Sequence, residues 1–191
     1  MSTLLADRLQ DPSASTRKAA CEALTLLGPG AAPHQAALCS CLEDEDEGVR
    51  KAACEALGSL GPGTVVAEHV QALAGCLEDE DEDVRRAACQ ALGALGSVAV
   101  AAYALALVEH LRDADSDVRA AACRTLGLLG GAVTPQHAAA LAESLRDEDE
   151  EVRRAACEAM GSLGPAPPVL EQVAGLAERL GDEDDEVRQA A

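Results

Sequence analysis

The sequence predicts an all-α fold, a solenoid in which about six two-helix repeats stack one on the next. One pattern, Leu-x-Asp-x-x-x-x-Val-Arg-x-Ala-Ala-Cys-x-Ala-Leu-Gly, recurs along the whole chain with small variations. No segment shows the alternation of apolar and polar residues that is typical of a strand. The arginine of the pattern returns every 33 to 35 residues, a period typical of solenoids and repeat arrays. These arginines are Arg17, Arg50, Arg85, Arg119, Arg153 and Arg188.

Each repeat is predicted to open with a helix that carries two leucines four residues apart. Leu38 and Leu42 are one such pair, and this spacing places both side chains on one helical face. A polar turn follows the second leucine and begins with an aspartate. The six turn aspartates are Asp11, Asp44, Asp79, Asp113, Asp147 and Asp182.

The second helix of each repeat is predicted to begin near the Val-Arg pair. In repeat two, Val49, Ala53 and Leu57 belong to a broad apolar face of this helix. A closing glycine then permits the backbone conformation with positive φ that ends many helices. The closing glycines are Gly28, Gly61, Gly96, Gly130 and Gly164. A second glycine column inside the helix predicts close backbone approach, and it holds Gly58, Gly93, Gly127 and Gly161.

The continuous repeat predicts a single solenoid over residues 1–191. The expected repeats are 1–28, 29–61, 62–96, 97–130, 131–164 and a truncated 165–191. Neither end carries the polar capping repeat that solenoids usually need. We therefore expect a piece of a longer array, or a chain that continues the stack by self-association.

Composition narrows the class of partner. The 191 residues hold 34 acidic and 15 basic side chains, a net charge of −19. Nucleic acid and anionic membranes both favour basic surfaces, so neither is an expected partner. No stretch is long and apolar enough to cross a bilayer, and the N-terminal residues lack the pattern of a secretory signal. The expected partner is another protein.

Eight cysteines are present, and five of them share one column of the repeat. Neighbouring helices lie about 8–10 Å apart, whereas a disulfide needs Cα atoms within about 7 Å. Disulfides within the column are therefore not expected. Free cysteines are typical of a reducing environment, so we expect an intracellular, cytoplasmic location. The column holds Cys21, Cys54, Cys89, Cys123 and Cys157.

The other three cysteines fall in the first helices. Cys39 aligns with apolar residues of the other repeats, which predicts a place in the core. Cys41 and Cys76 align with His110, Ser144 and Arg179, which predicts exposed and modifiable thiols.

The Leu-x-Asp turn, the Val-Arg pair and the Ala-Ala-x-x-Ala-Leu-Gly run together resemble the HEAT-repeat family. The likeness is to its short form, which is also found in phycobilin-lyase-like repeat proteins. It covers essentially the whole chain and implies a right-handed solenoid of HEAT-like repeats. It also implies a ladder between neighbouring repeats, formed by the six turn aspartates and six arginines named above. In such solenoids the second helices line the concave surface.

Two columns beside the ladder arginines vary from repeat to repeat, and they share one helical face. They are our candidates for partner binding, and we call them the second-helix face. The alternative is that they form solvated ion pairs with little energetic weight. The candidates are Lys18, Glu22, Lys51, Glu55, Arg86, Gln90, Arg124, Arg154 and Glu158.

The acidic side chains are concentrated in five turns, which we call the acidic edge. Negative charge at a helix start is stabilising by itself, because it offsets the helix dipole. The functional alternative is that the edge recruits a basic protein segment or loosely held cations. The five runs, which hold 24 of the 34 carboxylates, are 43–47, 78–83, 113–117, 147–151 and 182–186.

Motifs for catalysis or cofactor binding are missing from the sequence. The run from Asp113 to Asp117 lacks the sixth-position glycine and twelfth-position glutamate of a calcium loop. His34, His69 and His137 share a column without further converging ligands. We predict a non-enzymatic scaffold without metal or cofactor. The alternatives are a solenoid domain or subunit of a cofactor-handling enzyme such as a bilin lyase, and a synthetic near-consensus array.

Overall fold

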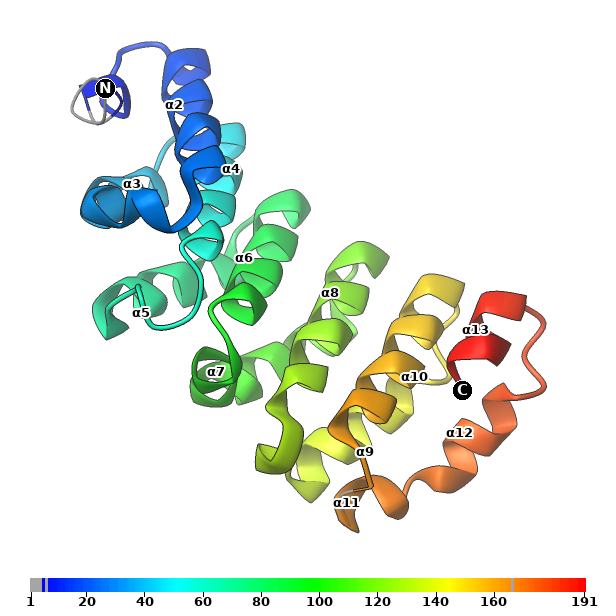
Figure 1. The fold of residues 1–191 in the computed structure, drawn as a ribbon. Helices are drawn as coiled ribbons and strands as arrows, with labels where there is room; N and C mark the ends of the chain where they lie inside the picture. The colour runs from blue at the N-terminus through cyan, green and yellow to red at the C-terminus, as the bar shows by residue number, and fades with distance from the viewer. Residues whose placement is uncertain (1–4, 6, 166) are drawn as a thin grey trace. The chain divides into compact units, whose positions relative to one another are not determined.

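The computed structural model describes residue 5 and residues 7–165 and 167–191, and every regular element among them is helical. The all-α prediction is confirmed. The chain divides into two compact units, Met1–Ala99 and Val100–Ala191, and each is a stack of helical pairs (Figure 1). The prediction that both belong to one continuous body stays a prediction. Among the helices of the described residues, none has the length and apolar character needed to cross a membrane.

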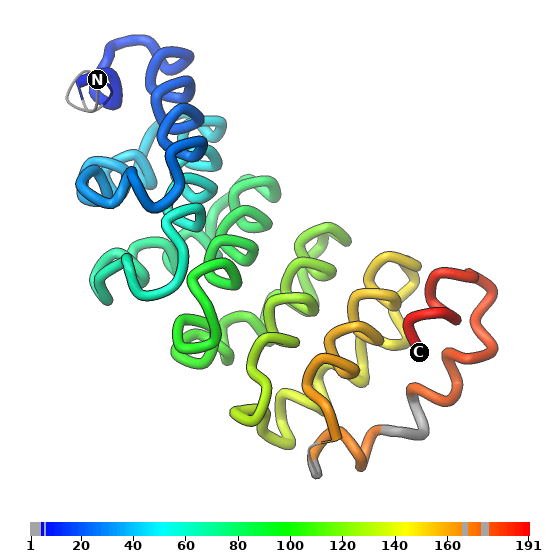
Figure 2. Tube along the Cα trace, viewed as in Figure 1, coloured from blue at the N-terminus to red at the C-terminus, as the bar shows by residue number. Residues whose placement is uncertain are grey.

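In the first unit the second helices of successive repeats lie side by side, and the first helices form a parallel layer against them (Figures 1 and 2). The second helices are α2 (Ala14–Leu27), α4 (Glu47–Ser59) and α6 (Glu82–Ala94). The first-helix layer contains α3 (Gln35–Cys41) and α5 (Ala67–Gly75). Two 3-10 segments adjoin them, η1 (Gly28–His34) and η2 (Cys76–Glu78).

The second unit repeats this layered arrangement, and α7 (Ser97–Glu109) contains the boundary between the units. Its second helices are α8 (Ser116–Leu126), α10 (Glu150–Leu163) and α13 (Asp185–Ala190). The remaining α-helices are α9 (Pro135–Ser144), α11 (Pro167–Leu170) and α12 (Val173–Arg179). The 3-10 segments are η3 (His110–Arg112) and η4 (Gly127–Ala132).

The core is built from the leucine columns and from the small residues of the second helices. Leu38, Leu73 and Leu141 of the first helices are fully buried, as are Val49 and Leu57 of α4. The column ends in the last repeat, where Leu180 is 62% exposed. There α13 spans only 6 residues and provides a much shorter apolar face than α10 does.

The two glycine columns have different outcomes. All five closing glycines have positive φ, for example 80° at Gly61, so their predicted role is confirmed. Close approach is confirmed at Gly58 and Gly127, where an added Cβ would lie 2.8 Å from a backbone Cα of the next second helix. The same prediction is wrong at Gly161, where nothing lies within 4 Å of the added atom.

The three cysteines of the first helices are not placed as the sequence predicted. Cys41 and Cys76 are only 4% and 6% exposed, so the prediction of accessible thiols is wrong. Cys39 is half-buried rather than part of the core. The same position is also buried at His110 and Ser144, which are 8% and 6% exposed. All eight cysteines are free.

Candidate protein-binding surface

Each turn is organised by two aspartates spaced two residues apart. The carboxylate of Asp44 accepts the backbone N–H of Asp46 at 3.0 Å, and the Asp46 carboxylate accepts that of Val49 at 3.1 Å. Asp46 is thereby the N-cap of α4, which satisfies an otherwise unpaired helix donor. The equivalent caps are Asp81, Asp115, Asp149 and Asp184. Sequence reasoning assigned these residues only general negative charge, although an aspartate three residues before the valine is an N-cap signal.

Arginines of the second helices bind the turn aspartate of the next repeat with two parallel hydrogen bonds. Arg17 donates to the two carboxylate oxygens of Asp44 at 2.6 and 2.7 Å. Such bidentate, charge-assisted pairs are among the strongest hydrogen bonds between side chains. The same geometry joins Arg50 to Asp79, Arg119 to Asp147 and Arg153 to Asp182.

The same arginines also hold the turn of their own repeat. The Nη1 group of Arg119 donates to the backbone carbonyls of Asp113 and Ala114, at 3.0 and 3.2 Å. Arg85 and Arg188 make the equivalent bonds, to Asp79 and Asp182 at 2.8 and 2.6 Å. At the first turn, Asp11 accepts the Ser13 N–H and an Arg8 ion pair. Every ladder residue expected from the resemblance therefore lies in a turn contact.

The ladder is buried and electrostatically satisfied. The side chains of Arg50 and Asp79 are only 10% and 11% exposed. The hydrogen bond from Arg17 holds the pKa of Asp44 below its ordinary value, and that from Arg153 does the same for the pKa of Asp182. These groups are committed to stacking the repeats, so they are poor candidates for binding a partner.

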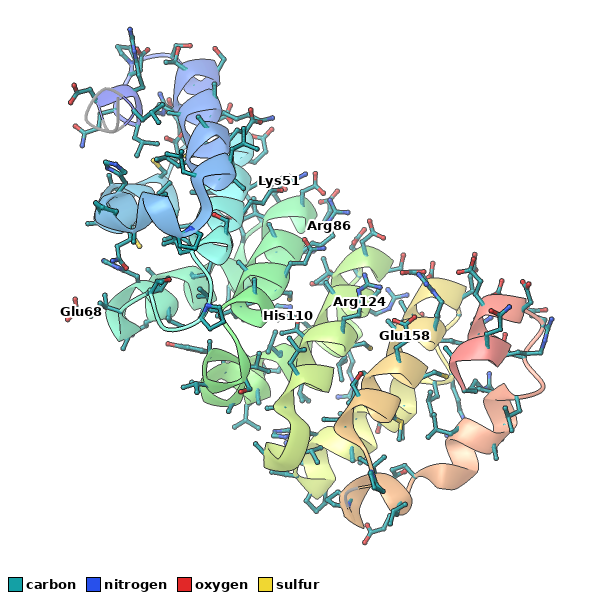
Figure 3. The ribbon with its side chains drawn as sticks, viewed as in Figure 1. Lys51, Glu68, Arg86, His110, Arg124 and Glu158 are labelled. Carbon is teal, nitrogen blue, oxygen red and sulfur yellow. The ribbon has the colours of Figure 1, made fainter. Side chains whose placement is uncertain are left out.

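Most cations of the second-helix face are already paired with the next repeat. Figure 3 shows Lys51 and Arg86 on the neighbouring helices α4 and α6, and both contact the carboxylate of Asp83. In the second unit, Arg124 binds Glu151 at 2.7 Å, and Arg154 lies 3.5 Å from Glu186. Lys51, Arg124 and Arg154 thus each contact a carboxylate of the next repeat, whereas the pair of Arg86 with Asp83 lies within α6. Arg154 also contacts Glu151 and Glu158.

Lys18 has no such ion pair, because the residue before the valine of the next repeat is different there. Where the later repeats carry an acidic residue before the valine, repeat two has Gly48. The ammonium of Lys18 lies 3.6 Å from the point where a Gly48 side chain would begin. Lys18 makes no ion pair among the described residues, and Glu22, Glu55 and Gln90 of the same face are exposed. The unit therefore leaves a mixed polar strip open to solvent.

The acidic edge separates into structural and exposed groups. Between the ladder aspartate and the capping aspartate stands a glutamate that points outward. Glu45 is 91% exposed and Glu80 is 93% exposed, each 3.9 Å from a ladder arginine. Glu148 and Glu183 hold the same position and are exposed, whereas the fourth turn has Ala114. The stabilising interpretation of the acidic runs applies to the capping aspartates. Recruitment of a basic segment or of cations by the exposed glutamates stays a prediction.

The described residues contain no group of three or more His, Cys, Asp or Glu side chains arranged to hold a metal ion. The Nδ1 atom of His69 lies 3.0 Å from the amide oxygen of Gln35. His137 exchanges hydrogen bonds with Thr134 at the start of α9, and burial lowers its pKa. A hollow of about 420 Å³ beside α9 is lined by the exposed pair Arg112 and Glu143.

Pairs of helices stacked in order and tied by an Asp–Arg ladder define a helical repeat protein of the solenoid class. The family model for HEAT repeats matches residues 2–69, 63–108 and 104–191. The chain belongs to the HEAT-repeat family. No curated protein matches it.

Solved structures with similar folds include engineered and natural proteins. One engineered protein is 24% identical over 99% of this chain and 92% of its own, with a TM-score of 0.76. The complex of CpcE and CpcF of phycocyanin lyase from Nostoc sp. PCC7120 is 27% identical, with a TM-score of 0.73. The match covers 99% of this chain and 73% of that chain. A designed armadillo repeat protein in complex with the peptide (KR)4 is 19% identical, with a TM-score of 0.71. The match covers 98% of this chain and 95% of that chain.

Proposed function

We propose that this chain is a non-enzymatic scaffold that binds another protein through its second-helix face and its acidic edge. One observation carries the proposal. In four of the turns the two aspartates bind a ladder arginine and cap the next helix, whereas the glutamate between them is exposed. Glu45 and Glu80 are 91% and 93% exposed, and each contacts the fold's arginines only at 3.9 Å. Exposed carboxylates with so small a part in the fold are suited to attracting a basic segment.

The two surfaces have different roles in this proposal. The acidic edge supplies long-range attraction, which raises the rate at which an oppositely charged partner arrives. The second-helix face supplies short-range contacts through Glu22, Glu55 and Gln90, which are exposed in the first unit. Lys18 adds one uncommitted positive charge and favours a partner that also carries a carboxylate.

The comparison with designed armadillo repeats supports a basic peptide as the ligand class. That protein, whose fold resembles this one, is in complex with the peptide (KR)4. We therefore propose that the partner presents an extended segment rich in lysine and arginine. A reducing, intracellular setting is part of the proposal, and the eight free cysteines support it.

The test is a titration of the full chain with a fluorescent peptide of four Lys-Arg repeats, beside an uncharged peptide of equal length. We expect binding of the basic peptide only, weakened by Glu80→Gln. The matched control is Glu68→Gln, because Glu68 lies on the first helix α5 and points away from the second-helix face (Figure 3). Equal affinities for the two variants would mean that the peptide responds only to net charge, and the proposed surface would be wrong.

A second candidate is favoured by the likeness to the phycocyanin lyase complex, the most identical of the three structures compared above. In that case the chain would be a subunit that handles a linear tetrapyrrole together with a partner subunit. Adding a free bilin to the chain distinguishes the two. A shifted and intensified absorption band would favour the lyase subunit, whereas an unchanged spectrum together with peptide binding would favour the scaffold.

A further inference from the structure

The exposed face of α2 carries three side chains of different character, one in each successive turn. Lys18, Glu22 and Leu26 are four residues apart, so they form one row along the helix. All three are exposed, and Leu26 is 89% exposed. We call this row the α2 strip. It presents a positive, a negative and an apolar side chain in order, from the start of the helix to its last turn.

The apolar end of the strip departs from the pattern of the repeat. The equivalent position holds small or polar residues in the other second helices, namely Ser59, Ala94 and Ser162. Stacking of the repeats therefore does not require a leucine there. Leu27 beside it is 44% exposed, so the end of α2 carries a small apolar patch next to charged residues. Apolar patches bordered by polar residues are typical of protein interaction sites.

The positive end of the strip departs from the pattern for a different reason. Lys51, in the same column as Lys18, binds the carboxylate of Asp83 at 3.0 Å. Opposite Lys18 the equivalent residue is Gly48, which has no side chain to offer. Two independent changes, at Gly48 and at Leu26, thus leave both ends of the α2 strip open to solvent.

Charge and polarity define what each position of the strip attracts. The ammonium of Lys18 attracts a carboxylate. Glu22, together with Glu55 in the same column of α4, attracts a positive side chain, and both glutamates are exposed. Leu26 gains free energy when an apolar side chain covers it, because apolar surface is then removed from water.

The spacing of the strip matches an extended chain. Residues four apart in an α-helix are separated by about 6 Å along its axis. Alternate side chains of an extended segment point to the same side and are about 6.6 Å apart. A segment lying along α2 therefore places every second side chain opposite one member of the strip.

We propose that the α2 strip binds an extended segment of a partner protein whose alternate side chains are acidic, basic and apolar, in that order from Lys18 to Leu26. The inference rests on the proposed scaffold function and adds the sequence preference of the bound segment. The acidic edge lies at the starts of the second helices, on the Lys18 side. Further basic residues of the partner should therefore continue the segment beyond its acidic residue.

The test measures binding of fluorescent peptides to the full chain at physiological ionic strength. One probe joins four Lys-Arg repeats to Asp-Ser-Lys-Ser-Leu, and a second has Leu-Ser-Lys-Ser-Asp ahead of the repeats, to allow for either chain direction. In the control peptides the aspartate and the lysine between the serines are exchanged. We expect one probe to bind about fivefold more tightly than its control and than the Lys-Arg repeats alone.

Variants of the chain assign the preference to the strip. Leu26→Ser and Lys18→Gln should each remove the difference between probe and control. Two matched variants should preserve it: Leu170→Ser, at a leucine of α11 that is 55% exposed, and Lys51→Gln, at a lysine that already binds Asp83. Serine occupies the position of Leu26 in α4 and α10, so Leu26→Ser should fold, and thermal unfolding checks this.

Three outcomes would count against the inference. Equal affinities for probe and control, while the Lys-Arg repeats still bind, would overturn it and leave the scaffold proposal standing. No binding of any peptide would contradict both proposals. Sedimentation of the free chain gives the third: a dimer that Leu26→Ser dissociates would mean that a second copy of the chain covers Leu26.

Discussion

Arg119 binds both carboxylate oxygens of Asp147, each at 2.8 Å, although the two residues belong to different repeats. The same guanidinium holds the carbonyls of its own turn, at Asp113 and Ala114. One side chain thus fixes a turn and joins it to the next turn. This double role explains why the arginine recurs in all six repeats while the residue after it varies.

Removing a ladder arginine should destabilise the fold strongly. We expect Arg119→Ala to lower the free energy of unfolding by about 1–3 kcal/mol, because it leaves buried acceptors unsatisfied. The matched control is Arg112→Ala. Arg112 also forms a 2.8 Å pair with a carboxylate of the next repeat, but its side chain is 79% exposed. Exposed pairs contribute only about 0–1 kcal/mol, so the control should change little. Equal shifts in urea unfolding would contradict a structural role of burial in the ladder.

Replacing the same arginine by lysine tests the importance of the two-pronged geometry. Arg119→Lys keeps the charge but loses the planar fork that reaches both carboxylate oxygens and the turn carbonyls. We expect a stability between those of the original chain and Arg119→Ala in the same urea experiment. A lysine variant as stable as the original chain would show that charge alone is sufficient.

Two glycines of one column should respond in opposite directions to alanine. Alanine is the better helix former by about 1 kcal/mol, so Gly161→Ala should stabilise, since nothing obstructs its new methyl group. Gly58→Ala should destabilise by about 1–3 kcal/mol, because the methyl would press on the backbone of Ala91 at 2.8 Å. Thermal unfolding of both variants checks the prediction. Stabilisation by both would mean that the helices have room to separate.

Acid should remove the contribution of the ladder carboxylates. The pKa of Asp44 is held below its ordinary value of 3.8, chiefly by the hydrogen bond from Arg17. A lowered pKa in the folded state contributes stability above the unfolded value, and that contribution is lost as the pH falls through the folded value. The destabilisation caused by Asp44→Asn should therefore be full at neutral pH and shrink below about pH 4. A difference that stays constant down to about pH 2 would contradict the assignment.

The two surfaces should affect different rates of binding to a basic peptide, the acidic edge the association rate and the second-helix face the dissociation rate. Glu80→Gln combined with Glu82→Gln should slow association, because attraction by exposed charge acts at long range. Added salt should reduce this difference, since the Debye length is about 8 Å at physiological ionic strength. Changing Arg86 and Gln90 to alanine should instead speed dissociation, if the second-helix face makes close contacts. Stopped-flow measurement of the association and dissociation rates at several salt concentrations checks both expectations. Association rates that do not change with salt would exclude the acidic edge as the recruiting surface.

The repeat pattern alone determined the architecture of each unit. The period, the leucine spacing and the closing glycines all act within one repeat, so they could be interpreted without knowing how repeats pack. Gly61 and Gly164 have positive φ for this local reason. The ladder partners Arg50 and Asp79 could be paired only through the resemblance, because their contact joins two repeats.

The tertiary structure decided which side chains are committed to the fold and which are open to a partner. The position before the turn leucine holds polar residues in some repeats and would be interpreted as surface, yet Cys41 and Cys76 are buried there. Lys18 and Lys51 have the same place in the repeat, but only Lys51 faces a carboxylate. Each difference depends on which residue of the next repeat lies opposite. The pattern within one repeat does not show which side chains of neighbouring repeats come into contact.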